Sequence, residues 1–140
     1  MNHWLIKVEP SEWSWAQQVA QKVSAWNGVR NHQAAGYLKS MALQDQAFFY
    51  HSVTGKAIQG IVEIVRTAYP DPTDPTGRFV SVDVKTIGSF PNPIPLQAIK
   101  SDLSLCNLPL VRQSRLSVMP IDESSWKKLC DWGGLSFQAR

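Results

Sequence analysis

Val80-Ser81-Val82-Asp83-Val84-Lys85 alternates apolar and polar side chains without interruption. This two-residue period is typical of a strand with one buried and one solvent-facing side. The stretch lies within residues 79–90, and two earlier segments, residues 46–52 and 58–66, are also rich in β-branched and aromatic side chains. The sequence therefore predicts three strands in the middle of the chain.

Shorter strands are predicted toward both ends. Residues 3–8 are dense in Trp, Leu, Ile and Val and are followed by Glu9-Pro10, and residues 115–120 form the last predicted strand. Residues 69–77 contain three prolines, which remove backbone donors and fix φ, so we expect an exposed extended loop there. A second irregular stretch is expected around Pro91, Pro93 and Pro95, followed by a short helical turn at residues 96–100.

Capping residues predict three helices. In the first helix, Ser14 and Gln17 match a capping box, and Trp15, Val19 and Val23 repeat every four residues on one face. Asn31 is the expected cap of a second helix that carries Ala34, Leu38 and Met41, although Gly36 weakens it by about 1 kcal/mol relative to Ala. Asp122 is expected to cap the last helix, which packs through Trp126, Leu129 and Cys130 and ends at Gly133-Gly134.

These elements predict an α+β fold with a curved, mostly antiparallel sheet, because the strands are uneven in length and do not alternate strictly with helices. With 140 residues, 44% of them hydrophobic, the chain is long enough for one domain with a core and too short for two. We expect a single domain over residues 1–134 and a disordered C-terminal tail at residues 135–140.

Charge and cysteine content narrow the class of protein. The net charge is +3, and the basic residues are scattered without a run, which argues against coating of nucleic acid by charge alone. The N-terminal residues lack the apolar segment of a signal peptide, and no window approaches a membrane span, so we expect a soluble, cytoplasmic protein. Cys106 and Cys130 form no C-x-x-C pair and are expected to be reduced thiols, with Cys130 in a packing role.

The stretch Trp26-Asn27-Gly28-Val29-Arg30-Asn31-His32-Gln33-Ala34 carries the strongest functional signal. Asn-Gly alone would suit a tight turn, because both residues tolerate positive φ. A turn has no need of the Trp before it or of the polar run after it, so we interpret the stretch as part of a binding pocket. A nucleobase fits these groups, since an indole can stack on its face while amide and imidazole groups read its edge.

Five strings carry a family resemblance. They are Trp4-Leu5-Ile6-Lys7-Val8-Glu9-Pro10, the pocket stretch at residues 26–34, Phe49-Tyr50-His51-Ser52, Ala68-Tyr69-Pro70-Asp71 and Leu116-Ser117-Val118. Together and in this order they resemble the EVE domain, the family of thymocyte nuclear protein 1, over nearly the whole chain. The resemblance implies a PUA-like fold, a small curved β-barrel flanked by short helices, related to the YTH domains that hold a methylated adenine of RNA.

The same resemblance implies a reader and not a catalyst. The expected ligand is DNA or RNA that carries a modified base, methylated or hydroxymethylated, and the expected protein partner is a restriction or modification enzyme. Two positions depart from the family pattern. Val8 stands where the family usually has Ser or Thr, so a hydroxyl is missing, and His32 stands where Tyr is common, which keeps a flat ring and adds a polar edge.

Site residues follow from the residue types and from this resemblance. We expect Trp26 to stack on the base and Asn31 and His51 to test its edge. Tyr50 and His51 are neighbours in a strand and point to opposite faces, so only one of them enters a given cavity, and we choose His51. The other expected ligand contacts are Lys7, Val8, Glu9, Arg30, Gln33 and Ser52, and Arg112 and Arg115 are expected to grip phosphates near the pocket mouth.

Each of these residues also has a purely structural interpretation. Trp26 could be a core anchor and Asn31 only a helix cap, and His51 could be a hydrogen-bonding group at a strand end. Lys7, Arg30, Arg112 and Arg115 could be ordinary surface charges, and Glu9 a strand-end charge.

Catalytic and metal signatures were not found in the sequence. It has no C-x-x-C, H-x-E or H-E-x-x-H spacing, no G-x-S-x-G elbow and no phosphate-binding glycine loop, so no cofactor is expected. Two alternatives to a reader stay open. One is an enzyme or accessory factor that acts on a modified nucleotide or small heterocycle, with His51 as acid or base. The other is a module whose aromatic cleft holds a peptide or metabolite.

Overall fold

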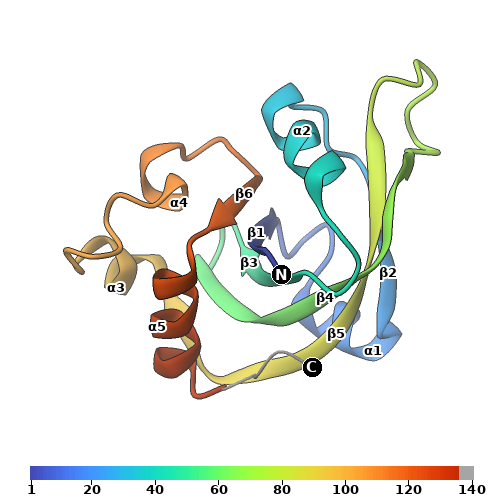
Figure 1. Ribbon diagram of the computed structural model, residues 1–140. Coiled ribbons are helices and arrows are strands. Elements are labelled where there is room, and N and C mark those ends of the chain that lie inside the picture. The colour runs from blue at the N-terminus through green and yellow to red at the C-terminus, as the bar shows by residue number, and fades with distance from the viewer. Residues whose placement is uncertain (136–140) are drawn as a thin grey trace.

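A computed structural model describes residues 1–135 of the chain (Figure 1). Within these residues, the strands form one sheet of six in the order β2-β5-β4-β3-β1-β6. They are β1 (His3–Val8), β2 (Val23–Trp26), β3 (Gln46–His51), β4 (Ala57–Pro70), β5 (Val80–Pro95) and β6 (Val118–Ile121). β1 and β3 run parallel and the other neighbouring pairs run antiparallel. The predicted α+β class and the mostly antiparallel sheet are confirmed.

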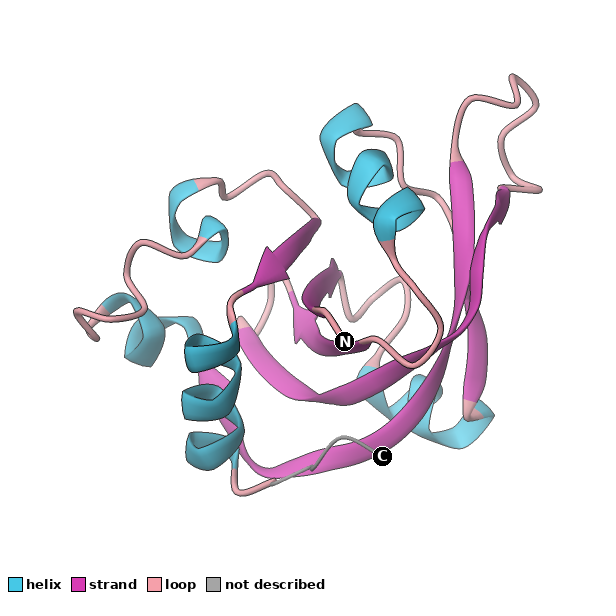
Figure 2. Cartoon of the chain, viewed as in Figure 1, coloured by secondary structure: helices cyan, strands magenta, loops and turns pink. Residues whose placement is uncertain are grey.

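The sheet curls without closing, so the predicted barrel is an open one with β2 and β6 at its edges. The two longest strands, β4 and β5, bend together along the curl (Figure 2). Their pairing register shifts at several points, the first between Ile58 and Gly60 and the last between Arg66 and Tyr69. Such bulges add an unpaired residue to one strand and bend it, which gives the hairpin its curvature.

The helices are α1 (Trp15–Gln21), α2 (His32–Ser40), α3 (Leu96–Lys100), α4 (Pro109–Arg112) and α5 (Glu123–Gly133). α2 contacts β6 at one edge of the sheet and also β4 and β5, so it lies across the opening of the curl (Figure 2). α5 packs against β5. The N-terminus of α2 therefore lies close to several strands that are far apart in sequence.

The core lies on both faces of β3. Phe48 is fully buried and stacks on Trp126 of α5, with ring centroids 4.0 Å apart. Phe49 is also fully buried and contacts Trp15 of α1 at 4.9 Å and Trp26 of β2 at 5.6 Å between ring centroids. Because both faces are covered, residues 47–50 of β3 form a continuous apolar and aromatic run and do not alternate with polar residues.

The predicted helix caps are confirmed. Ser14 and Gln17 form the capping box of α1, and the side chain of Asn31 accepts from Ala34 N at the start of α2. Asp122 accepts from Ser125 N at the start of α5, which ends at Gly134 in a left-handed conformation. Cys106 and Cys130 are both free, and Cys130 is buried in the core.

The predicted apolar face of the first helix is wrong in part. Val19 is 40% exposed, and Val23 lies in β2 and is 44% exposed. Trp15 and Gln18 form the buried side of α1 instead, with Gln18 Nε2 donating to the backbone oxygen of Lys22 at 3.2 Å. The strand β2 was not predicted, because four residues are too few for an alternating pattern to stand out from the helix before it.

Two proline-rich stretches also differ from the prediction. Residues 91–95 belong to β5 and are not irregular. Pro91, Pro93 and Pro95 alternate, so their nitrogens can all face the same side, and β2 pairs with β5 only from Val82 to Lys85. Proline fits a strand where its nitrogen faces an unpaired edge. β4 likewise continues to Pro70, so the predicted loop begins later, at Asp71.

The end of the predicted domain needs one correction. Leu135 was assigned to the tail, but its backbone N–H donates to Cys130 O at 3.1 Å and its side chain packs against the core. The rest of the predicted tail, residues 136–140, lies outside the described residues. None of the helices in residues 1–135 has the length and apolar character needed to cross a membrane.

Candidate functional site

A cavity of about 780 Å³ opens where the ends of β1 and β3 meet the loop between β2 and α2. Its volume lies in the usual range for ligand sites, about 300–1,000 Å³. Four segments supply most of its lining: the end of β1, the end of β3 with the loop after it, the residues 26–31, and the stretch before β6. From the predicted site it contains Lys7, Val8, Glu9, Trp26, Arg30, Asn31, Ser52 and Arg115.

Trp26 forms a wall of this cavity. Only 6% of its surface is exposed, and its ring meets Phe49 edge-on at an interplanar angle of 82°. Trp26 also lines a second cavity of about 380 Å³, which it shares with Val8, Glu12 and Trp13. Trp26 is therefore both a core anchor and a wall of the binding cavity, the two roles that the sequence left open.

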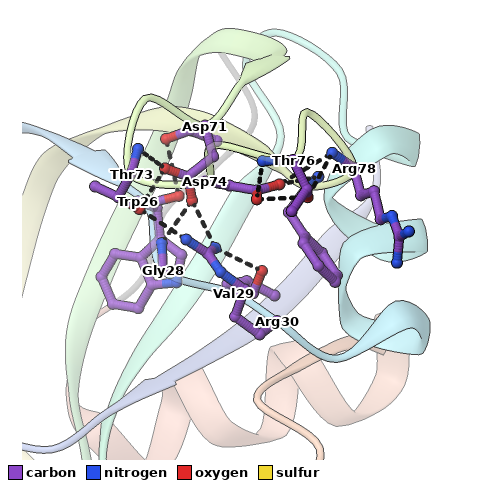
Figure 3. Close-up of polar contacts among 11 residues, drawn as sticks. Trp26, Gly28, Val29, Arg30, Asp71, Thr73, Asp74, Thr76 and Arg78 are labelled. Atoms are coloured by element: carbon purple, nitrogen blue, oxygen red, sulfur yellow. Dashed lines mark hydrogen bonds and ion pairs between the residues drawn. The ribbon is translucent and has the colours of Figure 1, made fainter.

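The loop that carries Trp26 is held by Asp71, a buried carboxylate at the start of the β4–β5 loop (Figure 3). Asp71 Oδ2 accepts from Gly28 N at 2.7 Å and from Arg30 Nη1 at 3.0 Å. Asp71 Oδ1 accepts from the backbone N and the hydroxyl of Thr73 at 2.7 and 2.6 Å. Gly28 adopts φ +81°, which glycine tolerates, so its N–H can face the carboxylate.

Hydrogen bonding keeps Asp71 ionised. Burial alone would raise its pKa, but the bonds from Thr73, Gly28 N and Arg30 outweigh burial and lower the pKa to about 2. The guanidinium group of Arg30 therefore makes its polar contacts within the protein. Its second terminal nitrogen donates to the Thr73 hydroxyl at 2.9 Å, and its side chain is 41% exposed beside the cavity.

The β4–β5 loop contains the Asp-Pro-Thr unit twice, at residues 71–73 and 74–76, and both copies fold in the same way. Asp74 Oδ1 accepts from the backbone N and the hydroxyl of Thr76, and Asp74 Oδ2 accepts from Arg78 N and Phe79 N (Figure 3). These bonds lower the pKa of Asp74 to about 2. The loop is exposed at most of its residues, as predicted, but it is not extended, since the buried Asp71 and Asp74 fold it into compact turns.

This loop also contacts the residues next to the cavity through Phe79. Its ring stacks on His32, with centroids 5.1 Å apart, and the Arg30 guanidinium lies 5.4 Å from the centroid of the same ring. The flat ring of His32, which stands where the family commonly has Tyr, is therefore stacked on Phe79 of the protein itself.

Basic residues border the cavity on two sides. Lys7 Nζ donates to Ser114 O at 3.0 Å and lies 5.9 Å from the centre of the Tyr50 ring. Burial, and the neighbouring charge of Lys56, lower the pKa of Lys7. Lys56 and Arg115 line the cavity as well, and no hydrogen bond of their side chains is found within residues 1–135. Glu9 and Glu12 supply negative charge to the same lining.

Asn31 lies between this cavity and a smaller one of about 330 Å³. Its side chain is used as the cap of α2, where it accepts from Ala34 N at 2.9 Å. Arg115 lines both cavities, whereas Gln33 and Arg112 line only the smaller one. The structure therefore separates Gln33 and Arg112 from the residues around Trp26. Arg112 also donates twice to the side chain of Asn107.

The choice of His51 over Tyr50 is corrected by the structure. Tyr50 lines the main cavity and His51 does not. His51 Nε2 accepts from Trp15 N at 2.9 Å, and its ring lies 5.8 Å from that of Phe49. Burial lowers the pKa of His51, which favours the neutral ring that can accept this bond. This placement gives no support to His51 as an acid or base in the main cavity.

Sequence reasoning missed Asp71, Tyr50, Asn27 and Lys56. Asp71 ends the family string at residues 68–71, and the repeated Asp-Pro-Thr unit is the sequence signal that could have revealed its role. Burial raises the pKa of Tyr50 to about 12, so its hydroxyl remains a donor at neutral pH. Among the described residues, no group of His, Cys, Asp and Glu side chains is placed to hold a metal ion.

A small α+β domain whose curled sheet carries, at its strand ends, a cavity lined by aromatic, apolar and basic side chains belongs to the class of ligand-binding domains of PUA-like fold. The EVE domain family model matches residues 2–132, and the chain belongs to this family. Human thymocyte nuclear protein 1 is a curated relative that is 32% identical over 159 aligned residues, which cover 89% of this chain and 71% of the relative.

Solved structures agree with this assignment. Rpa0253 from Rhodopseudomonas palustris superposes with a TM-score of 0.91 at 48% identity and covers 99% of this chain and 97% of its own. Human THYN1, solved in complex with DNA that contains 5-methylcytosine, superposes with a TM-score of 0.90 at 30% identity, covering 98% of this chain and 100% of its own.

The YTH domain of Zygosaccharomyces rouxii MRB1, solved with N6-methyladenosine RNA, gives a TM-score of 0.61 at 15% identity, covering 99% of this chain and 89% of its own. At that identity the likeness shows a shared fold, as the resemblance to YTH domains implied.

Proposed function

We propose that this EVE domain binds nucleic acid that carries a modified base, and that the base occupies the cavity beside Trp26. The observation that carries the proposal is the cavity itself, whose volume of about 780 Å³ accommodates a base with part of its sugar-phosphate. The human relative bound to 5-methylcytosine DNA supports the same ligand class.

The loop that presents Trp26 is preorganised for this task. Asp71 fixes Gly28 and Arg30 through charged hydrogen bonds, so the indole wall and the backbone groups next to it stay in place without a ligand. A rigid wall lowers the entropy lost when a planar ligand is ordered against it. The stacking expected of Trp26 is confined to the part of the ring that borders the cavity.

Polar groups around that wall would read the edge of the base. Glu9 and Ser52 supply acceptors, and Tyr50 and Asn27 supply donors, all from the lining of one cavity. Asn31 lies beside the cavity at the start of α2, but its side-chain oxygen already accepts from Ala34 N and is not available to the base. Lys56 and Arg115 would contact phosphates at the rim, and Arg112 with Gln33 would extend that contact into the smaller cavity.

Val8 bears on the choice of modification. It lines the cavities on both sides of Trp26 and offers an apolar surface where the family usually has a hydroxyl. A methyl group buried there contributes about 0.8 kcal/mol. Discrimination between a methylated and a plain base by this term alone is therefore only severalfold.

Titration of matched oligonucleotides tests the proposal. Single-stranded and duplex probes with one 5-methylcytosine, 5-hydroxymethylcytosine or N6-methyladenine are compared with the unmodified sequence by fluorescence anisotropy. Asn27→Ala removes an exposed cavity residue and Trp26→Phe reduces the wall, and both are expected to weaken binding of the preferred probe. Val19→Ala, on the exposed side of α1, is the matched control. Equal affinity for modified and plain probes that neither cavity variant changes would refute the proposal.

A further inference from the structure

The loop after β3 holds Val53 in an unusual backbone conformation. Val53 has φ +68°, and Thr54 N donates across it to Ser52 O at 2.7 Å, which makes a γ-turn. Positive φ is strongly disfavoured for β-branched residues, because the side chain then crowds the backbone.

Neither the backbone nor the core accounts for valine at this position. Glycine would adopt the same φ without strain, as the nearby Gly55 does at φ +60°. The Val53 side chain is 64% exposed, so it buries little apolar surface in the folded chain. We therefore expect the isopropyl group of Val53 to contact another molecule and not the protein itself.

The position of the turn indicates where such a contact would be made. Val53 lines the mouth of the main cavity. Both ends of its loop are tied to neighbouring segments, since Ser52 N donates to Val8 O at 2.9 Å and Leu96 N donates to Lys56 O at 3.0 Å. The turn therefore holds an apolar side chain in solvent at the cavity mouth, with Lys56 on the same rim.

We propose that Val53 is a wedge for duplex DNA. When a modified base leaves the stack and enters the cavity, the isopropyl group of Val53 occupies the space that the base has left. Unstacking a base is costly, and proteins that distort duplex DNA often place an apolar side chain between base steps to offset that cost. This inference rests on the proposed function, because it requires a base in the cavity, and it adds that the natural substrate is a duplex.

The wedge has a signature that a simple surface contact lacks. In a duplex, the vacated space lies beside stacked neighbours and opposite an orphaned base, and the wedge contacts both. A single strand needs no base pair opened and has no orphaned base. Loss of Val53 should therefore weaken duplex binding and leave single-strand binding nearly unchanged.

Val53→Gly and Val53→Ala test this with duplex and single-stranded probes that carry the same 5-methylcytosine. Glycine removes the side chain and relieves the strain, whereas alanine shortens the side chain but keeps Cβ and restrains the loop. We expect Val53→Gly to weaken duplex binding by about tenfold or more, Val53→Ala to act in the same direction, and single-strand affinity to change by less than about twofold. Val19→Ala, an exposed valine of α1, should change neither.

A 2-aminopurine next to the modified base supplies the second readout, since its fluorescence rises when stacking is lost. The wild type should raise this fluorescence on the duplex, and Val53→Gly should do so less at saturating protein. Equal losses on duplex and single strand, or no loss on the duplex, would overturn the wedge and leave the reader function standing. Absence of binding to any of the modified probes, duplex or single-stranded, would overturn both proposals, and preference for the single strand would overturn the duplex assignment alone.

Discussion

Asp71 divides its two carboxylate oxygens between two loops. One oxygen binds Gly28 N and Arg30 from the loop that carries Trp26, and the other binds Thr73 in its own loop. All four partners are donors, so the site requires a group that accepts at both oxygens. Only an ionised carboxylate does this, which is why the low pKa of Asp71 matters for the shape of the cavity.

Asp71→Asn should therefore loosen the Trp26 loop. An amide must turn its NH₂ toward one pair of donors, either Gly28 N and Arg30 or the two donors of Thr73. Loss of charged bonds at a buried site is expected to lower the free energy of unfolding by about 1–3 kcal/mol. It should also weaken binding to the modified probe, and denaturant unfolding with anisotropy measures the two effects.

Asp74→Asn is the matched control for this substitution. Asp74 folds the second Asp-Pro-Thr unit through the same kind of turn, but it makes no hydrogen bond to the Trp26 loop within residues 1–135. Its replacement should reduce stability and change affinity much less than Asp71→Asn does. If both variants lose affinity equally, the effect belongs to the stability of the β4–β5 loop and not to the pinning of Trp26.

At the level of elements, His51 joins the end of β3 to the first turn of α1 by accepting from Trp15 N. Burial lowers its pKa below the ordinary value of 6.5, so the unfolded chain binds a proton more readily than the folded chain does. The contribution of His51 to the free energy of unfolding is therefore fully present above pH 6.5. It decreases as the pH falls through 6.5 toward the pKa of His51 in the folded chain.

Replacement of His51 by glutamine should remove this contribution, because the glutamine side chain keeps an acceptor and does not titrate. We expect the free energy of unfolding of His51→Gln to vary less between pH 5 and pH 8 than that of the wild type, as measured by denaturant titration at several pH values. Some dependence should persist, since burial also lowers the pKa of His3. A steeper dependence in the variant would contradict the assignment.

The elements differ in how far sequence could predict them. Capping boxes and caps are local signals, and those at Ser14, Asn31 and Asp122 were read correctly. β2 was missed because its four residues follow α1 almost directly, and Val23 continues the spacing of Trp15 and Val19 by coincidence. The strand at residues 91–95 was missed because the tolerance of proline depends on which edge has a partner, and only the assembled sheet shows that.

In the site, too, local features could be predicted from sequence and features that depend on tertiary packing could not. The alternation rule correctly separated Tyr50 from His51, but it could not say which face of β3 borders the cavity. That depends on α1, whose Trp15 covers the face of Phe49 and His51. Most of the predicted ligand residues do line one cavity, because they cluster near strand ends and loops that the fold brings together.

At the scale of the whole molecule, the net charge of +3 is small for a protein that binds a polyanion. Four basic residues line the main cavity, namely Lys7, Arg30, Lys56 and Arg115. Arg30 is ion-paired with Asp71, and Lys7 already donates to Ser114 O. Lys56 and Arg115, with Arg112 of the smaller cavity, are left to neutralise phosphates, so most of the affinity should come from the base in the cavity.

Binding should therefore depend only weakly on salt. Three phosphate contacts on a duplex correspond to a slope of about −2.7 in a plot of log K against log salt concentration. Arg115→Ala should make this slope shallower by about 0.9 and leave the preference for the modified base unchanged, because the proposed contact of Arg115 is with a phosphate and not with the base. Lys39→Ala, in the last turn of α2 and outside all three cavities, should leave the slope as it is. A wild-type slope several times steeper would mean that charge spread over the surface, and not the cavity, dominates binding.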